Sequence, residues 1–218
     1  MNPRSKKIPL LFAAALLLLF LSIALAILLA QYQVRANRHP PLLVLGQVND
    51  FSLTNELGRA VSLADLRGQV WVADIIFTRC PGPCIRMTRQ MKELQDALPA
   101  SAGVKFVSMT TDPDFDTPPV LKVFAEKYGA DLDRWLFLTG TKKQIADVAG
   151  GSLKFSAVEK TPAERQTADD LFVHSTIFAL VDRRGQLRGV FETGGEGVNW
   201  PKTKLQLLAS VRALEREP

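Results

Sequence analysis

The two cysteines of this 218-residue chain lie in one short turn, Cys80-Pro-Gly-Pro-Cys84. The turn follows the apolar run 70–77 and precedes a stretch with helical spacing of apolar residues, which places both thiols at a helix N-terminus. Amide donors and the helix dipole stabilise a thiolate there, so we expect lowered thiol pKa values and cysteines that act as nucleophiles or as ligands of a soft metal ion. A purely structural disulfide is the alternative, but its loop is too short to stabilise the fold much.

A site for Cu(I) needs a third soft or borderline ligand besides two thiolates. The chain has two histidines, His39 and His174, and only His174 directly precedes an apolar strand-like run, 176–181. The spacing alone leaves His174 open to interpretation as an ordinary, partly buried histidine. Met87 and Met91 lie one helical turn apart after the second cysteine, and core packing is favoured over a role in passing copper along.

The rest of the chain predicts strands that alternate with helices. A hairpin is expected at the start of the domain and another near its end, and Thr117 and Thr141 are expected as helix N-caps. The run 70–77 is nearly continuous and β-branched, as in a central strand that is covered on both faces. This order implies an α/β sandwich with a mixed sheet. Strands are expected at 51–54, 59–63, 70–77, 104–109, 135–138, 176–181 and 187–191, and helices at 62–66, 84–98, 118–128, 142–148 and 201–216.

An apolar run at 8–30 is long enough to cross a hydrocarbon core of about 30 Å as one helix. Three basic residues precede it and two follow it, a bias that favours a cytoplasmic amino terminus and a domain outside the cytoplasm. No Arg- and Ser-rich transit sequence precedes the run, which favours a bacterial plasma membrane. Cleavage after a signal-like Ala24-Leu-Ala26 stays open. The expected division is 1–7 cytoplasmic, 8–30 transmembrane, 31–41 tether and 42–218 globular domain.

Charge and motif patterns exclude several other functions. Five basic residues precede the first acid, and the remaining 22 meet 22 acidic residues, so the folded part is neutral and has no basic footprint for nucleic acid. Asp112, Asp114 and Asp116 alternate as in a calcium loop, but the required glycine and glutamate are missing, and these acids are expected to shape a turn and cap the next helix. The glycines of 194–197 lack the lysine of a phosphate loop.

Taken together, three motifs and the apolar segment resemble the Sco/SenC family. The motifs are Phe77-Thr-Arg-Cys-Pro-x-x-Cys84, Thr111-Asp-Pro-x-x-Asp-Thr-Pro118, and His174-Ser-Thr176 leading into Leu180-Val-Asp-x-x-Gly185. Members of that family are membrane-anchored copper-binding proteins with a thioredoxin-like fold that help assemble the copper centre of cytochrome c oxidase.

The resemblance implies that Cys80, Cys84 and His174 bind copper and that the thiol pair cycles with a thiol reductant protein, because oxidised cysteines cannot hold Cu(I). The implied client is cytochrome c oxidase subunit II or another apo-copper protein. The implied role is not enzymatic.

This chain departs from the family pattern at several positions around the ligands. Arg79 and Ile85 replace the usual residues that flank the two cysteines, Val173 replaces an acidic residue, and Gly82-Pro83 fills the turn. None of these changes removes a ligand. The positive charge of Arg79 is expected to lower the thiol pKa further.

A thiol–disulfide oxidoreductase is the alternative function, with Cys80 attacking and Cys84 resolving. Thioredoxin-type reductases place a cis-proline before a late strand, but 170–176 has no proline and holds His174 instead, which favours metal binding. A peroxidase would use the same fold, although its catalytic arrangement cannot be recognised in the chain.

Overall fold

The computed structural model describes residues 7–37, 42–165 and 171–217. The chain divides into two units, Met1–Pro41 and Leu42–Pro218. The first unit holds the helix α1 (Lys7–Asn37), in which the stretch Ala15–Tyr32 is long and apolar enough to cross a membrane. This stretch overlaps the predicted transmembrane run 8–30, and α1 continues as helix over residues 31–37 of the expected tether.

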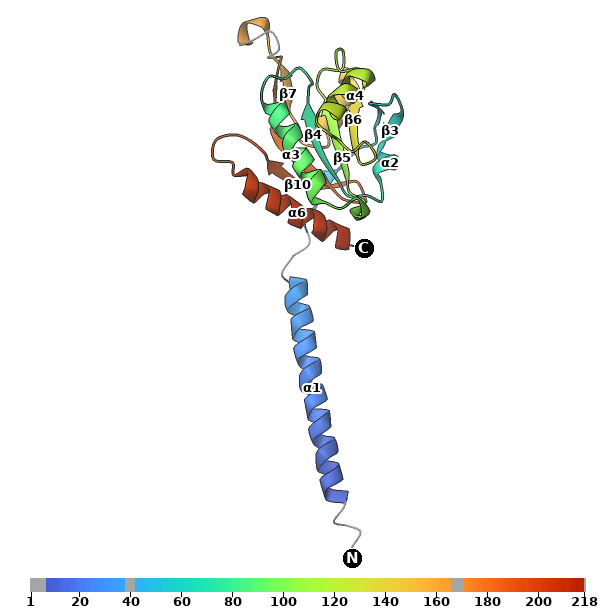
Figure 1. The fold of residues 1–218 in the computed structure, drawn as a ribbon, viewed down its shortest axis with the longest axis vertical. Helices are drawn as coiled ribbons and strands as arrows, with labels where there is room; N and C mark the ends of the chain where they lie inside the picture. The colour runs from blue at the N-terminus through green and yellow to red at the C-terminus, as the bar shows by residue number, and fades with distance from the viewer. Residues whose placement is uncertain (1–6, 38–41, 166–170, 218) are drawn as a thin grey trace, which may run out of the picture. The chain divides into compact units, whose positions relative to one another are not determined.

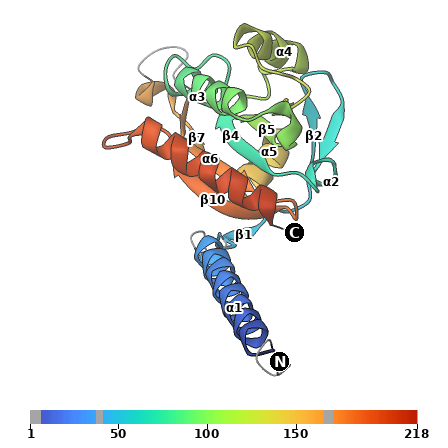
Figure 2. The same cartoon turned by 60° about the horizontal axis from the view of Figure 1, so that its bottom comes forward.

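The second unit is an α/β sandwich, as predicted, with helices on both faces of one mixed sheet (Figures 1 and 2). Its elements in chain order are β1 (Gly46–Gln47), β2 (Ser52–Asn55), β3 (Ala60–Ser62), α2 (Leu63–Leu66), β4 (Trp71–Ile76), α3 (Pro83–Ala97), η1 (Ala100–Ala102), β5 (Lys105–Thr110), α4 (Pro118–Lys127), β6 (Trp135–Thr139), α5 (Lys142–Ala149), β7 (Ala157–Glu159), η2 (Pro162–Glu164), β8 (Phe172–His174), β9 (Ile177–Val181), β10 (Gln186–Glu192) and α6 (Trp200–Arg216).

The eight-stranded sheet has the order β1-β10-β9-β4-β5-β6-β2-β3. Strand β4 is parallel to β5 and antiparallel to β9, so that Val72 lies opposite Phe106 on one side and Leu180 on the other. All six residues of β4 are buried. The predicted central strand is therefore confirmed, and the cysteine turn follows shortly after the end of this fully buried strand.

Alternate residues of β4 pack into two separate cores, because successive side chains of a strand point to opposite faces. Val72 and Ile76 belong to the cluster formed with α3, α4 and α6, whereas Trp71, Ala73 and Ile75 belong to the cluster formed with α2 and α5. Both cysteines belong to the first cluster.

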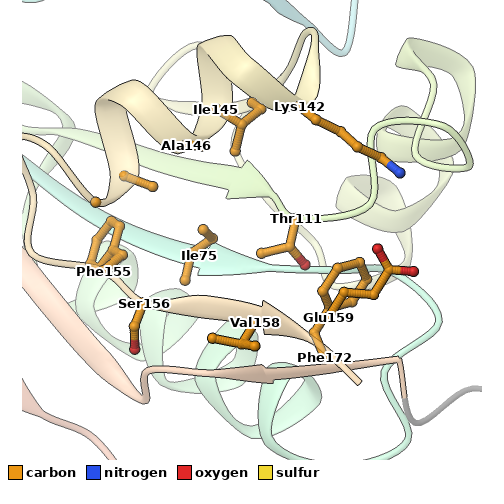
Figure 3. A pocket seen from close by; sticks show the side chains of 12 residues that line it. Ile75, Thr111, Lys142, Ile145, Ala146, Phe155, Ser156, Val158, Glu159 and Phe172 are labelled. Atoms are coloured by element: carbon orange, nitrogen blue, oxygen red, sulfur yellow. The ribbon is translucent and has the colours of Figure 1, made fainter. Parts of the chain in front are cut away.

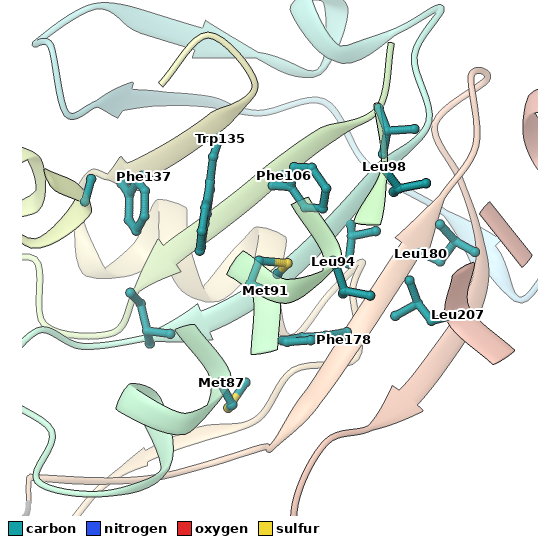
Figure 4. Packing of buried hydrophobic residues seen from close by; sticks show 14 of the residues in the cluster. Met87, Met91, Leu94, Leu98, Phe106, Trp135, Phe137, Phe178, Leu180 and Leu207 are labelled. Carbon is teal, nitrogen blue, oxygen red and sulfur yellow. The ribbon is translucent and has the colours of Figure 1, made fainter. Parts of the chain in front are cut away.

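Figure 4 shows the interior of that first cluster, where the two methionines of α3 lie among aromatic and leucine side chains. Met87 and Met91 are fully buried, which confirms their predicted role in core packing. Their burial fixes the face of α3 that also carries Cys84, because residues three or four positions apart share one face of a helix.

The hairpin of β7 and β8 was not predicted. It forms a separate two-stranded sheet, in which Ala157 lies opposite His174 and Glu159 lies opposite Phe172. Each strand has only three residues and lacks a long alternating pattern, so little in the sequence indicates it. The stretch before β9 is therefore part of this hairpin, and His174 is the last residue of a strand.

Candidate metal and thiol site

The cysteine turn joins the end of β4 to the start of α3. Pro83 occupies the first helical position, after Gly82 as the N-cap residue. Cys84 therefore lies in the first helical turn and is fully buried, and Cys80 is only 5% exposed. The intervening residues 81–83 are exposed. The two sulfurs thus lie beneath a short turn that itself reaches the surface.

The turn brings the two cysteine side chains together. A hydrogen bond with the Cys80 side chain is one cause of the altered Cys84 pKa. The Cys84 sulfur also accepts a hydrogen bond from the Phe77 N–H at 3.4 Å, and the Cys80 N–H donates to the Phe77 carbonyl at 3.2 Å. The backbone of Phe77 therefore binds both the Cys84 sulfur and the Cys80 backbone.

The predicted lowering of the thiol pKa is wrong for Cys84. Burial raises the pKa of this thiol, the nearby Cys80 and the buried Asp74 raise it further, and only the Phe77 N–H lowers it. The prediction considered the amide donors and the dipole of the helix, but the Cys84 side chain points from the first helical turn into the core, where removal from water disfavours the charged form. Cys84 is thus held as a protonated thiol in the absence of a metal or a strong base.

The expected lowering of the thiol pKa by Arg79 is also not found for Cys84. Its guanidinium lies 2.5 Å from a carboxylate oxygen of Asp112 and 4.1 Å from the centre of the Phe115 ring. The charge is therefore neutralised by an ion pair with the 111–117 loop, and Arg79 is absent among the causes that shift the Cys84 pKa.

The acidic loop after β5 shapes a turn, as predicted, because the N–H groups of Phe115 and Asp116 both donate to the Asp112 carbonyl. The prediction that its acids cap the next helix is wrong. The N-cap residue of α4 is Thr117, as predicted, whereas the Asp116 carboxylate accepts hydrogen bonds from Thr78 and Thr110. Asp116 thereby connects the loop to the cysteine turn.

Strand β8 runs close to the sulfur pair. The ring of Phe172 packs edge-on against that of Phe77, with 5.2 Å between their centres, and the Phe77 N–H is the donor to Cys84. His174 is two residues further along β8, with its backbone opposite Ala157. The His174 side chain and the whole of His39 lie outside the described residues.

The structure brings together the two sulfurs of the three predicted ligands. In the described part of the chain, which leaves out the His174 side chain, no three His, Cys, Asp or Glu residues lie close enough to hold a metal ion. Two adjacent thiols are chemically suited to a soft ion such as Cu(I) and equally to disulfide formation.

An apolar cleft of about 370 Å³ lies beside β8 (Figure 3). Ile75, Ile145 and Phe155 contribute to its lining, Lys142 and Glu159 lie around it, and neither cysteine lines it. Phe172 lines the cleft as well as packing on Phe77. The cleft is therefore lined without the sulfurs, and the exposed part of the chain next to them is the turn 81–83.

The sequence did not indicate the roles of three residues near the cysteines, Asp74, Asp116 and Phe172. Asp74 is the one charged residue in the apolar run 70–77, a signal that could have indicated a special environment. Asp116 was assigned a local capping role, and its contact with Thr78 spans 38 positions. The contact of Phe172 with Phe77 has no local signal, because it depends on the hairpin.

Comparison with known proteins gives a consistent result. The SCO1/SenC family model matches residues 46–199. The SCO1 protein homolog of Bacillus subtilis is 38% identical over 143 residues, which cover 65% of this chain and 71% of that protein.

Solved structures share the fold. The structure of BsSco, a member of the Sco family of cytochrome c oxidase assembly proteins in which a disulfide switch was identified, has a TM-score of 0.67 at 32% identity and covers 82% of this chain and 100% of that chain. The copper-bound structure of Bradyrhizobium japonicum ScoI has a TM-score of 0.59 at 21% identity, with coverage of 77% and 99%. The thioredoxin-like fold implied by the family resemblance is confirmed.

Proposed function

Because this chain belongs to the SCO1/SenC family, we propose that it binds copper through Cys80, Cys84 and His174 and delivers it to cytochrome c oxidase subunit II or another apo-copper protein. The observation that carries this proposal is the pair of adjacent, buried sulfurs at the end of the central strand. Thiolate sulfur is a preferred donor for Cu(I), and imidazole is a common third ligand.

The position of β8 supports His174 as the third ligand. Phe172 packs on Phe77, whose N–H binds the Cys84 sulfur. Alternate residues of a strand share a face, so positions 172 and 174 lie on the same face of β8. A ligand at position 174 is thus close along the strand to the residue that contacts the cysteine site.

The apolar helix α1 supports an anchor in a bacterial plasma membrane, with a single crossing and the domain outside the cytoplasm. In that location a thiol reductant protein is needed to return an oxidised Cys80–Cys84 pair to the dithiol that can take up Cu(I). Labelling of an introduced surface cysteine in intact spheroplasts by a membrane-impermeant maleimide tests the orientation. Labelling only after lysis would contradict it.

Copper binding is tested on the full chain in detergent, reduced under anaerobic conditions and titrated with Cu(I) against a chelator of known affinity. We expect about one tightly bound Cu(I) per chain, and loss of tight binding in Cys80→Ser and Cys84→Ser. His174→Ala should weaken binding at least tenfold, because one of three ligands is removed. His39→Ala is the matched control, since His39 is the other histidine of the chain. Equal affinities of the two histidine variants would remove His174 from the site.

A thiol–disulfide oxidoreductase is the second candidate, and the contact between the cysteine side chains favours it. The Cys80 thiolate would attack a disulfide of an apo-copper protein and release one partner thiol. Cys84 would then attack the mixed disulfide, which releases the second partner thiol and leaves a Cys80–Cys84 disulfide.

The peptide bonds of the described residues are all trans, so the structure adds no cis-proline to this candidate in those segments. Rapid reduction of insulin by the full chain, unchanged in His174→Ala, would favour the reductase. No reduction, together with tight Cu(I) binding, would favour copper delivery.

A further inference from the structure

We propose that Asp116 is a positioning residue for the cysteine pair, which holds the turn at Thr78 so that Cys80 stays beside Cys84. This inference rests on the proposed function in one respect, that the two sulfurs act together as a pair. The effect would be exerted through the backbone before the turn, because Asp116 contacts Thr78 and is not itself part of the sulfur pair.

The contacts of the Asp116 carboxylate converge on one short segment. One oxygen accepts the Thr78 N–H at 3.1 Å and the Thr110 hydroxyl at 2.5 Å, and the other accepts the Thr78 hydroxyl. Asp116 is fully buried. Thr78 is two residues before Cys80, directly after the residue whose N–H and carbonyl bind the two cysteines. The carboxylate therefore fixes the point at which the chain leaves β4.

The loop that carries Asp116 is itself tied to the same region of the chain. The Thr111 N–H donates to the Ile76 carbonyl at 2.8 Å, and the Asp112 carboxylate binds Arg79 at 2.5 Å. The Asp116 N–H donates to the Asp112 carbonyl at 2.8 Å. The loop thus contacts this segment at three residues, Ile76, Thr78 and Arg79. Asp116 makes the contacts with the middle one, Thr78.

Burying the carboxylate of Asp116 costs free energy, because the charged form is removed from water. Burial raises the pKa of Asp116, and the hydrogen bonds from Thr110 and Thr78 act in the opposite direction. A charged acceptor forms shorter and stronger hydrogen bonds than a neutral one, and two of the three donor groups belong to Thr78. On balance the pKa of Asp116 is raised, so these hydrogen bonds offset only part of the burial penalty, and most of them hold Thr78, which leads into the cysteine turn.

The dithiol–disulfide equilibrium of the pair measures this placement directly, without any metal. We would equilibrate the full chain in detergent with glutathione redox buffers and determine the fraction oxidised by alkylation and mass. When Asp116→Ala releases Thr78, the two sulfurs spend less time in contact. We expect the equilibrium constant for disulfide formation to fall at least tenfold, which is about 30 mV for this two-electron couple.

Two further variants make the test specific. Asp116→Asn keeps an oxygen that can accept the Thr78 N–H, so we expect its equilibrium constant within threefold of the wild type. Asp182→Ala is the matched control, because Asp182 is also buried and accepts two backbone N–H groups, from Arg184 and Gln186. It should lower stability and leave the cysteine equilibrium unchanged.

An unchanged equilibrium in folded Asp116→Ala, or an equal change in Asp182→Ala, would overturn the proposal. If Asp116→Ala does not fold, Thr78→Val decides, since it removes one hydroxyl donor and keeps the shape of the side chain. A shift of at least threefold supports the proposal and a smaller shift overturns it. If the wild type binds no copper but Asp116→Ala shifts the equilibrium, the copper function fails and the positioning role stands.

Discussion

The contact between Phe172 and Phe77 makes the most direct prediction about the third ligand. Phe172 is half-buried, and its ring meets that of Phe77 at 65° and 5.2 Å, the edge-to-face geometry that aromatic pairs prefer. This ring contact joins β8 to the residue that directly follows β4. Phe172→Ala removes this contact while it leaves both cysteines in place.

The expected size of the effect follows from the interactions that the truncation removes. An edge-to-face pair contributes about 0.5–1.5 kcal/mol beyond its buried area. Burying a whole phenylalanine contributes about 1.5–3 kcal/mol, so a half-buried ring adds about 1 kcal/mol. The docking of β8 should therefore weaken by about 2 kcal/mol. If His174 depends on that docking, the affinity for Cu(I) should fall by up to about 30-fold, since 1.4 kcal/mol corresponds to a factor of ten.

The assay is the anaerobic Cu(I) competition on the full chain in detergent, paired with the cysteine redox equilibrium. We expect weaker Cu(I) binding and an unchanged redox equilibrium, because the truncation removes a ring contact and keeps the backbone groups of Phe77 that bind the two cysteines. Val158→Ala is the control on the partner strand β7, where this side chain is 64% exposed. Wild-type Cu(I) affinity in Phe172→Ala, with a lowered free energy of unfolding, would refute the link between β8 docking and the metal site.

Three other predictions concern stability and thiol chemistry. Arg188→Ala leaves the buried Asp182 without its partner at 2.7 Å and also removes the contact with Glu217, so urea unfolding should show a loss of about 3–5 kcal/mol; a loss below 1 kcal/mol contradicts this. Lys154 has a φ of 64°, and Lys154→Gly should stabilise the domain by about 0.5–1 kcal/mol, whereas no gain would show that the conformation is not strained. The raised pKa of Cys84 keeps its thiol protonated, so the rate at which iodoacetamide alkylates Cys84 in the native chain should stay low from pH 7 to 9. In the urea-unfolded chain the same rate should rise steeply over this range. Parallel pH profiles of the two rates would contradict the prediction.

The local patterns of the sequence were sufficient for most of the sheet and for the cysteine turn. Trp71–Ile76 could be recognised as the central strand because only a strand covered on both faces tolerates such a continuous β-branched run. The start of α3 was predicted within one residue from the helical spacing of its apolar residues, and the loop prediction had included Pro83, which occupies the first helical position. The N-cap Thr141 was also confirmed, and its hydroxyl accepts the Gln144 N–H.

The electrostatics of the site could not be predicted from the same patterns. A helix N-terminus lowers a thiol pKa only where water or donors stabilise the charge, and whether Cys84 faces the core depends on α4 and α6, which come later in the chain. Arg79 likewise pairs with Asp112, 33 positions away. Spacing shows which groups can react, and tertiary burial decides in which protonation state they do so.

Burial of the sulfur pair and exposure of the turn above it have a joint consequence for the proposed copper chemistry. A bare dithiolate is disfavoured, because Cys84 is desolvated and lies near Cys80 and Asp74. Without a metal, Cys84 is therefore held as a neutral thiol, which reacts slowly with oxidants because the thiolate is the nucleophile. Copper entry must displace thiol protons, so uptake should strengthen as the pH rises. A donor or client that approaches over the exposed residues 81–83 can exchange ligands with sulfurs that are otherwise shielded.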